Sequence, residues 1–254
     1  MELGPIHRYP FRLMKSLIIG AGEVGTSLKN VLKPYHEIII RDKAPMECKD
    51  VEVLHICYPD FDGFVETTKN YISEYKPHLT VIHSSVRIGT TRKCGNGVVY
   101  SPIRGRHPDN GLDKEMKSFV KFIACVDPYY SDRAFDYFSV RANWTCFITR
   151  KPESLEFLKM LSNIHMGLEI AWRQEVERME KKLGIEEGVY GIWEETYRKG
   201  YQALNQPNLI RPVMRPDPIG GHCILPCTEL LKQQFESKFF DLILESNKNK
   251  LDNK

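Results

Sequence analysis

Residues 16–25 read Ser-Leu-Ile-Ile-Gly-Ala-Gly-Glu-Val-Gly, and this stretch decides the fold. Its first four residues have the apolar character of a short buried strand. The residues that follow, 23–32, place their apolar side chains on one face of a predicted helix. The three glycines therefore stand at a turn between a strand and a helix, which is the context that makes their spacing informative.

Each glycine of this turn has a structural role that a larger residue could not fill. Gly20 permits the tight turn, Gly22 lets the backbone approach a pyrophosphate, and Gly25 lets the helix pack closely on the strand. The amides at the start of the helix then face the phosphates. Asp42 follows the second predicted strand at 42 − 20 = 22 residues from Gly20, close to the ~20 typical of the acid that binds ribose hydroxyls. The pattern predicts a dinucleotide site.

The residues beside Asp42 bear on which dinucleotide is bound. Arg41 and Lys43 flank the acid and are the cations that would accommodate the 2′-phosphate of NADP. The acid itself favours a free ribose hydroxyl, so we predict NAD rather than NADP.

Short apolar runs alternate with amphipathic stretches through the first 150 residues. Strands are predicted at 16–19, 37–40, 53–57, 80–83, 98–100, 119–125 and 144–148, and helices at 23–32 and 64–75. Strand, helix and strand at this spacing imply parallel pairing through right-handed crossovers. We predict an α/β fold, with a Rossmann-type doubly wound parallel sheet followed by a smaller helical domain.

The pattern changes at Arg150-Lys151-Pro152. Residues 154–183 form one helical pattern ended by Gly184, and further helices are predicted at 186–203 and 228–244, with a proline-rich loop between them. We expect an N-terminal extension at 1–13, an NAD-binding domain at 14–150 and a helical dimerisation and catalytic domain at 151–254.

Composition excludes several classes of protein. The formal net charge is only +3 with both signs interspersed, which gives no support to binding of nucleic acid or a membrane surface. No apolar run approaches the ~18 to 20 residues of a membrane span, and no signal peptide is evident. The seven scattered cysteines are typical of reduced thiols, so we expect a cytoplasmic protein.

Three later segments carry candidate chemistry. Ser84 and Ser85 follow a strand at the carboxyl edge of the sheet, where doubly wound folds bind ligands. Lys159 and Asn163 are four residues apart on the long helix and so project from one face. Cys223 follows a glycine pair and precedes a helix, where the helix dipole lowers the pKa of a thiol.

Together these segments resemble the UDP-glucose/GDP-mannose (nucleotide-sugar) dehydrogenases, which oxidise a primary alcohol of a UDP-hexose or its relatives to a carboxylate with two NAD. The resemblance rests on the glycine turn, residues 84–91 (Ser-Ser-Val-Arg-Ile-Gly-Thr-Thr), Tyr100-Ser101-Pro102 with Arg104, Lys159-x-x-x-Asn163, and Gly220-Gly221-His222-Cys223. It implies catalytic roles for Cys223, Lys159, Asn163 and Ser85. It implies cofactor contacts at Gly20, Gly22, Glu23, Val24, Gly25, Asp42, Tyr58, Pro59 and Ser84. It also implies a small-molecule substrate and a homodimer formed through the long helix.

Several positions depart from this family. The family has an acid where Cys227 stands, usually Glu where Ile103 stands, and Thr where Ser85 stands. It also continues into a third domain that binds the nucleotide of the substrate, so we expect a shortened form. A thiol is a poor general base for hydrolysing a thioester, which makes a two-electron oxidation at least as favoured as a four-electron one.

Two alternatives stay open. The Lys159 and Asn163 pair also resembles the β-hydroxyacid dehydrogenases, which use the lysine as acid and base for a single hydride transfer. The departures also suit a catalytically impaired protein that binds NAD as a regulatory subunit. We predict no metal site, since Cys223, Cys227 and His222 fall short of four ligands. His55, His78, His107 and His165 are predicted to be structural or surface residues.

Overall fold

The computed structural model describes residues 12–105 and 111–252. The predicted extension at 1–13 lies almost wholly outside the described residues, as does His107. The chain divides into two compact units, Met1–Lys159 and Met160–Lys254, which are described separately. Among the described residues, no helix combines the length and the apolar character needed to cross a membrane.

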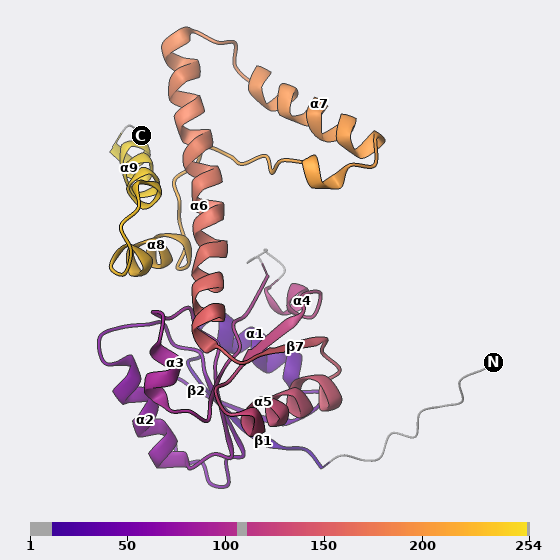
Figure 1. Ribbon diagram of the computed structural model, residues 1–254, viewed down its shortest axis with the longest axis vertical. Helices are drawn as coiled ribbons and strands as arrows, with labels where there is room; N and C mark the ends of the chain where they lie inside the picture. The colour runs from indigo at the N-terminus through magenta and orange to yellow at the C-terminus, as the bar shows by residue number, and fades with distance from the viewer. Residues whose placement is uncertain (1–11, 106–110, 253–254) are drawn as a thin grey trace, which may run out of the picture. The chain divides into compact units, whose positions relative to one another are not determined.

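The first unit is built on a seven-stranded sheet (Figure 1). Its strands are β1 (Lys15–Ile19), β2 (Glu37–Arg41), β3 (Val53–Ile56), β4 (Leu79–Ile82), β5 (Val98–Tyr100), β6 (Lys121–Ala124) and β7 (Cys146–Thr149), in the order β2-β1-β3-β4-β5-β6-β7. Strands β1 to β5 are parallel, and β6 and β7 run the opposite way. The predicted Rossmann-type α/β fold is confirmed, with one reversal of direction at β5.

The helices of this unit are α1 (Glu23–Leu32), α2 (Phe64–Tyr75), α3 (Thr90–Cys94), α4 (Asp113–Met116) and α5 (Pro128–Phe135), and α5 continues into a π-helical turn, η1 (Asp136–Arg141).

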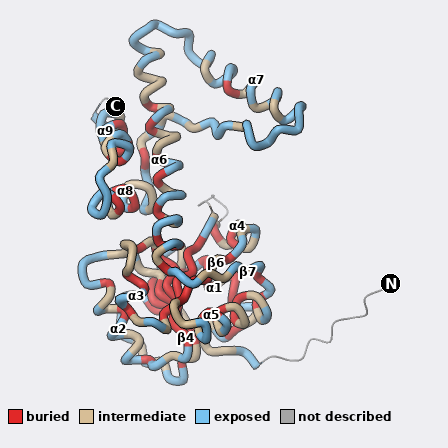
Figure 2. Tube along the Cα trace, in the orientation of Figure 1, coloured by how far each residue is buried: buried red, intermediate tan, exposed pale blue. Residues whose placement is uncertain are grey.

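Alternate residues of the strands face the two sides of the sheet. Ile18 of β1 packs in one apolar cluster with α1, α5 and η1, whereas Leu17 and Ile19 pack in a second cluster with α2 and α3. Figure 2 shows the buried strands between these helices. Burial on both faces is why the strands read as continuous apolar runs.

The short helices α3, α4 and α5 were not predicted from the sequence. Local hydrogen bonds explain α5, because the Asp127 carboxylate accepts the Tyr129 N–H at 3.0 Å and Pro128 occupies the first helical position. Helices this short carry too few apolar residues to show a clear period.

The second unit contains most of α6 (Pro152–Leu183), with α7 (Val189–Ala203), a 3₁₀ turn η2 (Pro207–Leu209), α8 (Ile224–Lys232) and α9 (Lys238–Asp252). Gly184 ends α6 with φ +64°, as its predicted C-cap role requires. The single helix predicted at 228–244 is wrong. Two helices meet there because Ser237 accepts the Phe239 N–H on its hydroxyl at 3.3 Å and starts a new helix.

Candidate functional site

The glycine turn between β1 and α1 is shaped by close packing at two of its three glycines. Gly20 has φ +105°, and a Cβ there would lie 2.9 Å from the Tyr58 amide nitrogen. A Cβ on Gly25 would lie 1.9 Å from the carbonyl oxygen of Gly20. Around Gly22, in contrast, a Cβ would meet no atom within 4 Å. Packing therefore requires Gly20 and Gly25, while the space in front of Gly22 is open.

A pocket of about 460 Å³ lies against this turn. Its lining residues are Ile19, Gly20, Gly22, Asp42, Lys43, Cys57, Tyr58, Pro59, Phe61, Thr67 and Tyr71. The exposed Asp42 carboxylate stands next to the turn, accepting the Ala21 N–H at 3.4 Å. Open backbone, one acid and an apolar wall fit the phosphates, ribose and ring of a dinucleotide. Glu23 and Val24 begin α1 beside the pocket.

Arg41 does not face this pocket. Its guanidinium donates to the Ala44 carbonyl at 3.1 Å, to Glu74 at 3.1 Å and to the Tyr75 hydroxyl. Arg41 is buried by these contacts, so of the two cations beside Asp42 only Lys43 lines the pocket. This arrangement favours the predicted NAD over NADP.

The turn after β4 is tied to the wall of the pocket. The buried Ser84 donates its hydroxyl hydrogen to the Tyr58 carbonyl at 2.5 Å. Further along the turn, Arg87 donates to Asp60 at 3.0 Å, and Ser85 is partly exposed between them. The predicted residues Tyr58, Pro59 and Ser84 therefore lie together at the carboxyl edge of the sheet.

Glu156 is a buried site residue that the sequence analysis missed. Its two carboxylate oxygens accept the N–H of Gly89 at 2.6 Å and of Thr91 at 2.8 Å. It therefore fastens the first turns of α6 to the turn that carries Ser84 and Ser85. Burial raises the pKa of this carboxyl, and the two amide hydrogen bonds oppose that rise. The only signal in the sequence is its position three residues before Lys159.

The structure brings Asn163 to a thiol, but to Cys227 rather than Cys223. The Asn163 amide donates to the Cys227 sulfur at 3.2 Å, and Cys227 is buried. Cys223 is the N-cap residue of α8 and is partly buried. Lys159 belongs to the first unit and Cys223 to the second. The convergence of Lys159, Asn163 and Cys223 therefore stays a prediction.

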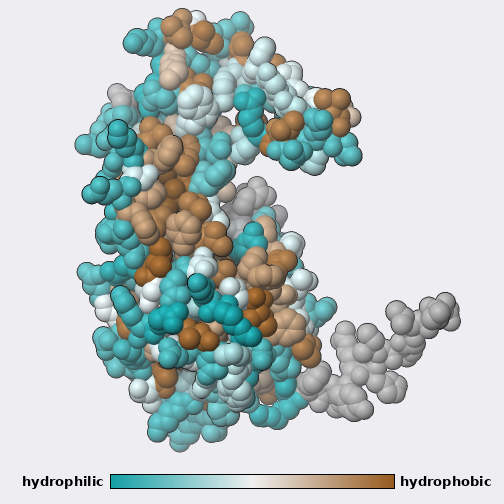
Figure 3. Space-filling model, viewed as in Figure 1, coloured by the Kyte–Doolittle hydropathy of each residue, from teal (hydrophilic) through white to brown (hydrophobic). Residues whose placement is uncertain are grey.

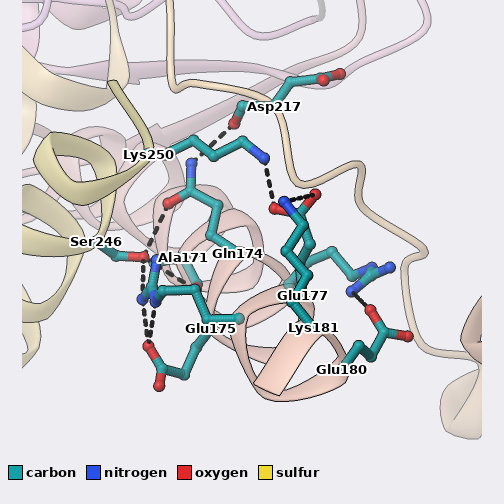
Figure 4. A network of polar contacts seen from close by, with 11 residues as sticks. Ala171, Gln174, Glu175, Glu177, Glu180, Lys181, Asp217, Ser246 and Lys250 are labelled. Carbon is teal, nitrogen blue, oxygen red and sulfur yellow. Dashed lines mark hydrogen bonds and ion pairs between the residues drawn. The ribbon is translucent and has the colours of Figure 1, made fainter. Parts of the chain in front are cut away.

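The segment that leads to Cys223 is held by the polar network of Figure 4. The buried Gln174 of α6 donates to the Asp217 carbonyl at 2.8 Å and accepts from Ser246 of α9 at 2.8 Å. Two residues further on, the Ile219 N–H donates to Asn247 at 2.7 Å. The backbone is thus fixed just before Gly220-Gly221-His222-Cys223. Within the described residues, no three His, Cys, Asp or Glu side chains gather as a metal site.

No family model and no curated protein sequence matches the chain. Solved structures, in contrast, do match the chain. A UDP-glucose dehydrogenase from the archaeon Pyrobaculum islandicum is 16% identical with a TM-score of 0.70, and the match covers 97% of this chain and 70% of the dehydrogenase. The UDP-N-acetyl-mannosamine dehydrogenase of Staphylococcus aureus is 15% identical with a TM-score of 0.71, covering 92% and 67%.

The fold is shared with nucleotide-sugar dehydrogenases. The resemblance predicted from the sequence is confirmed at this level, and NAD is consistent with the fold. A 3-hydroxyisobutyrate dehydrogenase from Mycobacterium tuberculosis also matches, at 12% identity and a TM-score of 0.60, covering 92% of both chains. The chain therefore shares its fold with dehydrogenases of both predicted families.

Proposed function

We propose that the protein is an NAD-dependent dehydrogenase that resembles the nucleotide-sugar 6-dehydrogenases and oxidises an alcohol or aldehyde of a small molecule, such as a sugar derivative, with Cys223 as the nucleophile. The observation that carries this proposal is the open space at Gly22, which faces a pocket lined by Asp42. Packing within the protein does not require a glycine at position 22, because a side chain there would touch no other protein atom. A ligand that approaches the backbone at Gly22 would explain why the residue is a glycine.

The proposed roles follow from the chemistry of the side chains. When bound, NAD would accept the hydride. Lys159 and Asn163 would supply a cation and an amide donor to stabilise the negative charge that develops on the substrate oxygen. Cys223 would attack the aldehyde carbon as a thiolate and give a tetrahedral thiohemiacetal. Ser85 would hydrogen-bond the substrate from the turn after β4.

Calorimetry with NAD and NADP tests the cofactor assignment. We expect NAD to bind more tightly than NADP and Gly22→Val to weaken NAD binding more than tenfold, because the valine side chain would occupy the space of the pyrophosphate. Binding that survives this substitution, or a strong preference for NADP, contradicts the assignment.

Absorbance of NADH tests the reaction with nucleotide sugars and 3-hydroxy acids as substrates. In a single turnover we expect one NADH per substrate, or a thioester trapped on Cys223, since Cys227 supplies no carboxylate to activate water. Rapid release of acid with two NADH would refute this expectation. Cys223→Ser serves as the control that removes the nucleophile.

A second candidate is a single hydride transfer with Lys159 as acid and base. The match over 92% of both chains to a 3-hydroxyisobutyrate dehydrogenase favours it. It requires that Cys223→Ser keep full activity while Lys159→Met loses it. NAD binding without turnover of any substrate would instead support the regulatory subunit.

We also propose that the protein is a cytoplasmic homodimer formed through α6. The seven cysteines all lie in the described residues and form no disulfide there, which suits a reducing compartment. Leu161, Trp172, Met179 and Leu183 of α6 are exposed and lie 11, 7 and 4 residues apart, so they follow one stripe of the helix. Figure 3 shows apolar side chains gathered along α6. An exposed apolar stripe of this length is typical of a protein interface.

A further inference from the structure

Arg41, the last residue of β2, is held by three hydrogen-bond acceptors. Its Nε donates to the Ala44 carbonyl at 3.1 Å, and a terminal nitrogen donates to the Glu74 carboxylate at 3.1 Å and to the Tyr75 hydroxyl. The Arg41 side chain is only 8% exposed, although β2 is an edge strand of the sheet. Its guanidinium is thus occupied by contacts within the first unit.

Two aromatic rings of α2 flank the same guanidinium. Its central carbon lies 5.2 Å from the centroid of the Tyr71 ring and 5.8 Å from the centroid of the Tyr75 ring. Cations are attracted to the faces of aromatic rings at such distances. Tyr71 also lines the pocket beside the glycine turn, whereas Arg41 does not. The cation therefore lies next to a residue of the pocket without facing the pocket itself.

These contacts also fix the loop that follows β2. The Tyr75 hydroxyl donates to the Met46 carbonyl at 3.1 Å, and Arg41 holds the Ala44 carbonyl of the same loop. The loop belongs to no helix or strand. Its first residue is Asp42, which is exposed and lines the pocket. The position of the Asp42 backbone therefore depends on Arg41 and Tyr75.

The charges at the ribose end of the pocket decide between the two dinucleotides. NADP differs from NAD by a phosphate on the 2′ position of this ribose, and a phosphate monoester carries about −1.5 to −2 charges at pH 7. Among the described residues that line the pocket, Asp42 repels this group and the exposed Lys43 attracts it. A second cation at this end would offset the Asp42 carboxylate.

Arg41 has the chemistry of that second cation. A guanidinium donates two parallel hydrogen bonds to phosphate oxygens and keeps its charge at any pH near neutrality. Arg41 directly precedes Asp42 in the chain, so its backbone already stands at the ribose end. Glu74 and Tyr75, however, accept hydrogens of the guanidinium that a phosphate would need. Their contacts therefore compete with binding of the 2′-phosphate.

We propose that Glu74 and Tyr75 make the site specific for NAD by holding the Arg41 guanidinium against α2. The three residues are called the Arg41 clamp below. The clamp withholds a cation from the 2′-phosphate of NADP, and it fixes the loop that presents the Asp42 carboxylate to the free ribose of NAD. This role rests on the proposed dehydrogenase function. It assigns the choice of cofactor to a helix outside the phosphate-binding turn.

A purely structural role of the clamp predicts a different result. Removing the acceptors of Arg41 would then loosen the loop and weaken NAD and NADP by similar factors, because both dinucleotides place the same ribose beside Asp42. The proposed role predicts unequal changes, since a released cation attracts only the cofactor that carries the 2′-phosphate. The ratio of the two affinities therefore separates specificity from stability.

Calorimetric titration of the whole protein with NAD and NADP measures this ratio. The wild type should bind NAD more tightly. The double variant Glu74→Ala with Tyr75→Phe removes both side-chain acceptors and keeps the aromatic ring at position 75. It should bind NADP at least tenfold more tightly than the wild type does, and NAD no more tightly. An unchanged or weaker affinity for NADP overturns the proposal.

Arg41→Met, added to the double variant, identifies the cation that is released. We expect the gain in NADP affinity to disappear in this triple variant, because no guanidinium remains to bind the phosphate. A gain that persists without Arg41 would come from the loosened loop alone, and it would refute the clamp. Should the double variant not fold, Glu74→Ala alone replaces it, since the Glu74 side chain is 49% exposed. Its expected gain is about threefold.

Glu66→Ala is the matched control on the same helix. It removes a carboxylate that pairs with Lys69 at 3.6 Å on the surface, and it should change neither affinity. The wild type alone tests the proposed function, because a protein that binds neither dinucleotide would refute that function and the clamp together. A wild type that prefers NAD, together with a double variant that gains nothing for NADP, would refute the clamp and leave the proposed function standing.

Discussion

Gly22 and Gly25 lie three residues apart in one turn, yet the atoms around them differ completely. We expect Gly22→Val to leave the melting temperature almost unchanged and to weaken NAD binding more than tenfold. Gly25→Ala should lower the free energy of unfolding by about 3 kcal/mol or more, because its Cβ would overlap the Gly20 carbonyl. Calorimetry and thermal unfolding of both variants measure the two effects.

Each of these variants is the control for the other. A Gly22→Val protein that is unfolded, or a Gly25→Ala protein that is as stable as the wild type, would show that the turn is packed differently from the way described.

The stability of the protein should depend on pH through Lys121. Its pKa is about 7 in the folded state and ~10.4 in the unfolded chain. Between these values the unfolded chain binds more protons, so the free energy of unfolding rises with pH. Urea unfolding should show a rise of about 1.5 kcal/mol between pH 7 and 8.5.

The matched variant is Lys121→Met, which should lack this rise. The comparison is best kept below pH 8.5, since the raised pKa of Cys57, Cys94 and Cys146 acts in the opposite sense above it. Equal slopes for the wild type and the variant would exclude Lys121 as the source.

Residues with a local motif could be predicted from the sequence, and residues with distant partners could not. The glycine turn and Asp42 have a fixed spacing that their chemistry requires. The partners of His55 lie 28 and 82 residues away, on other elements of the fold. The sequence also offered Arg41 as a phosphate ligand, but Tyr75, 34 residues away, removes it from the pocket.

At the scale of elements, the beginning of α6 depends on Glu156. In the wild type both carboxylate oxygens of Glu156 accept backbone N–H groups. In Glu156→Gln the amide N–H₂ would face one of these N–H groups, so we expect the free energy of unfolding to fall by about 2 to 3 kcal/mol. Glu153→Gln, on the same helix, removes the more exposed pair with Arg92 and should have little effect. Urea unfolding of the two variants measures the difference. Equal losses would contradict the role given to Glu156.

The elements that could be predicted are those with enough residues to show a period. Both α1 and α2 have the predicted bounds, because a long apolar stripe identifies them. The break between α8 and α9 was missed because apolar residues continue across it, and the hydroxyl of Ser237 decides it. The reversal at β5 leaves no local mark, since strand direction is set by the connections.

For the whole molecule, the proposed dimer predicts a mass of twice 29.5 kDa in solution. Trp172→Glu with Met179→Glu should yield monomers, because two charges would be buried without partners at the interface. Phe147→Glu is the matched control, as Phe147 of β7 is 56% exposed and Trp172 is 55% exposed. Light scattering after size-exclusion chromatography measures the mass. A monomeric wild type, or a dimer that survives both charges, excludes this interface.

The reversal of strand direction between β5 and β6 leaves these two strands joined by fewer backbone pairs than the other neighbouring strands of the sheet. Within the described residues, the two strands pair at Tyr100 and Ala124 alone, whereas β6 and β7 share four pairs. The β6–β7 ribbon is therefore joined to the rest by little backbone ladder, and it should open as a unit before the parallel strands do. In native-state hydrogen exchange, the amides of β6 should exchange by this opening well before those of β3 and β4. Each opening would also admit water to the buried Lys121 amine, so the exchange of its proton with solvent should be as slow as this local unfolding.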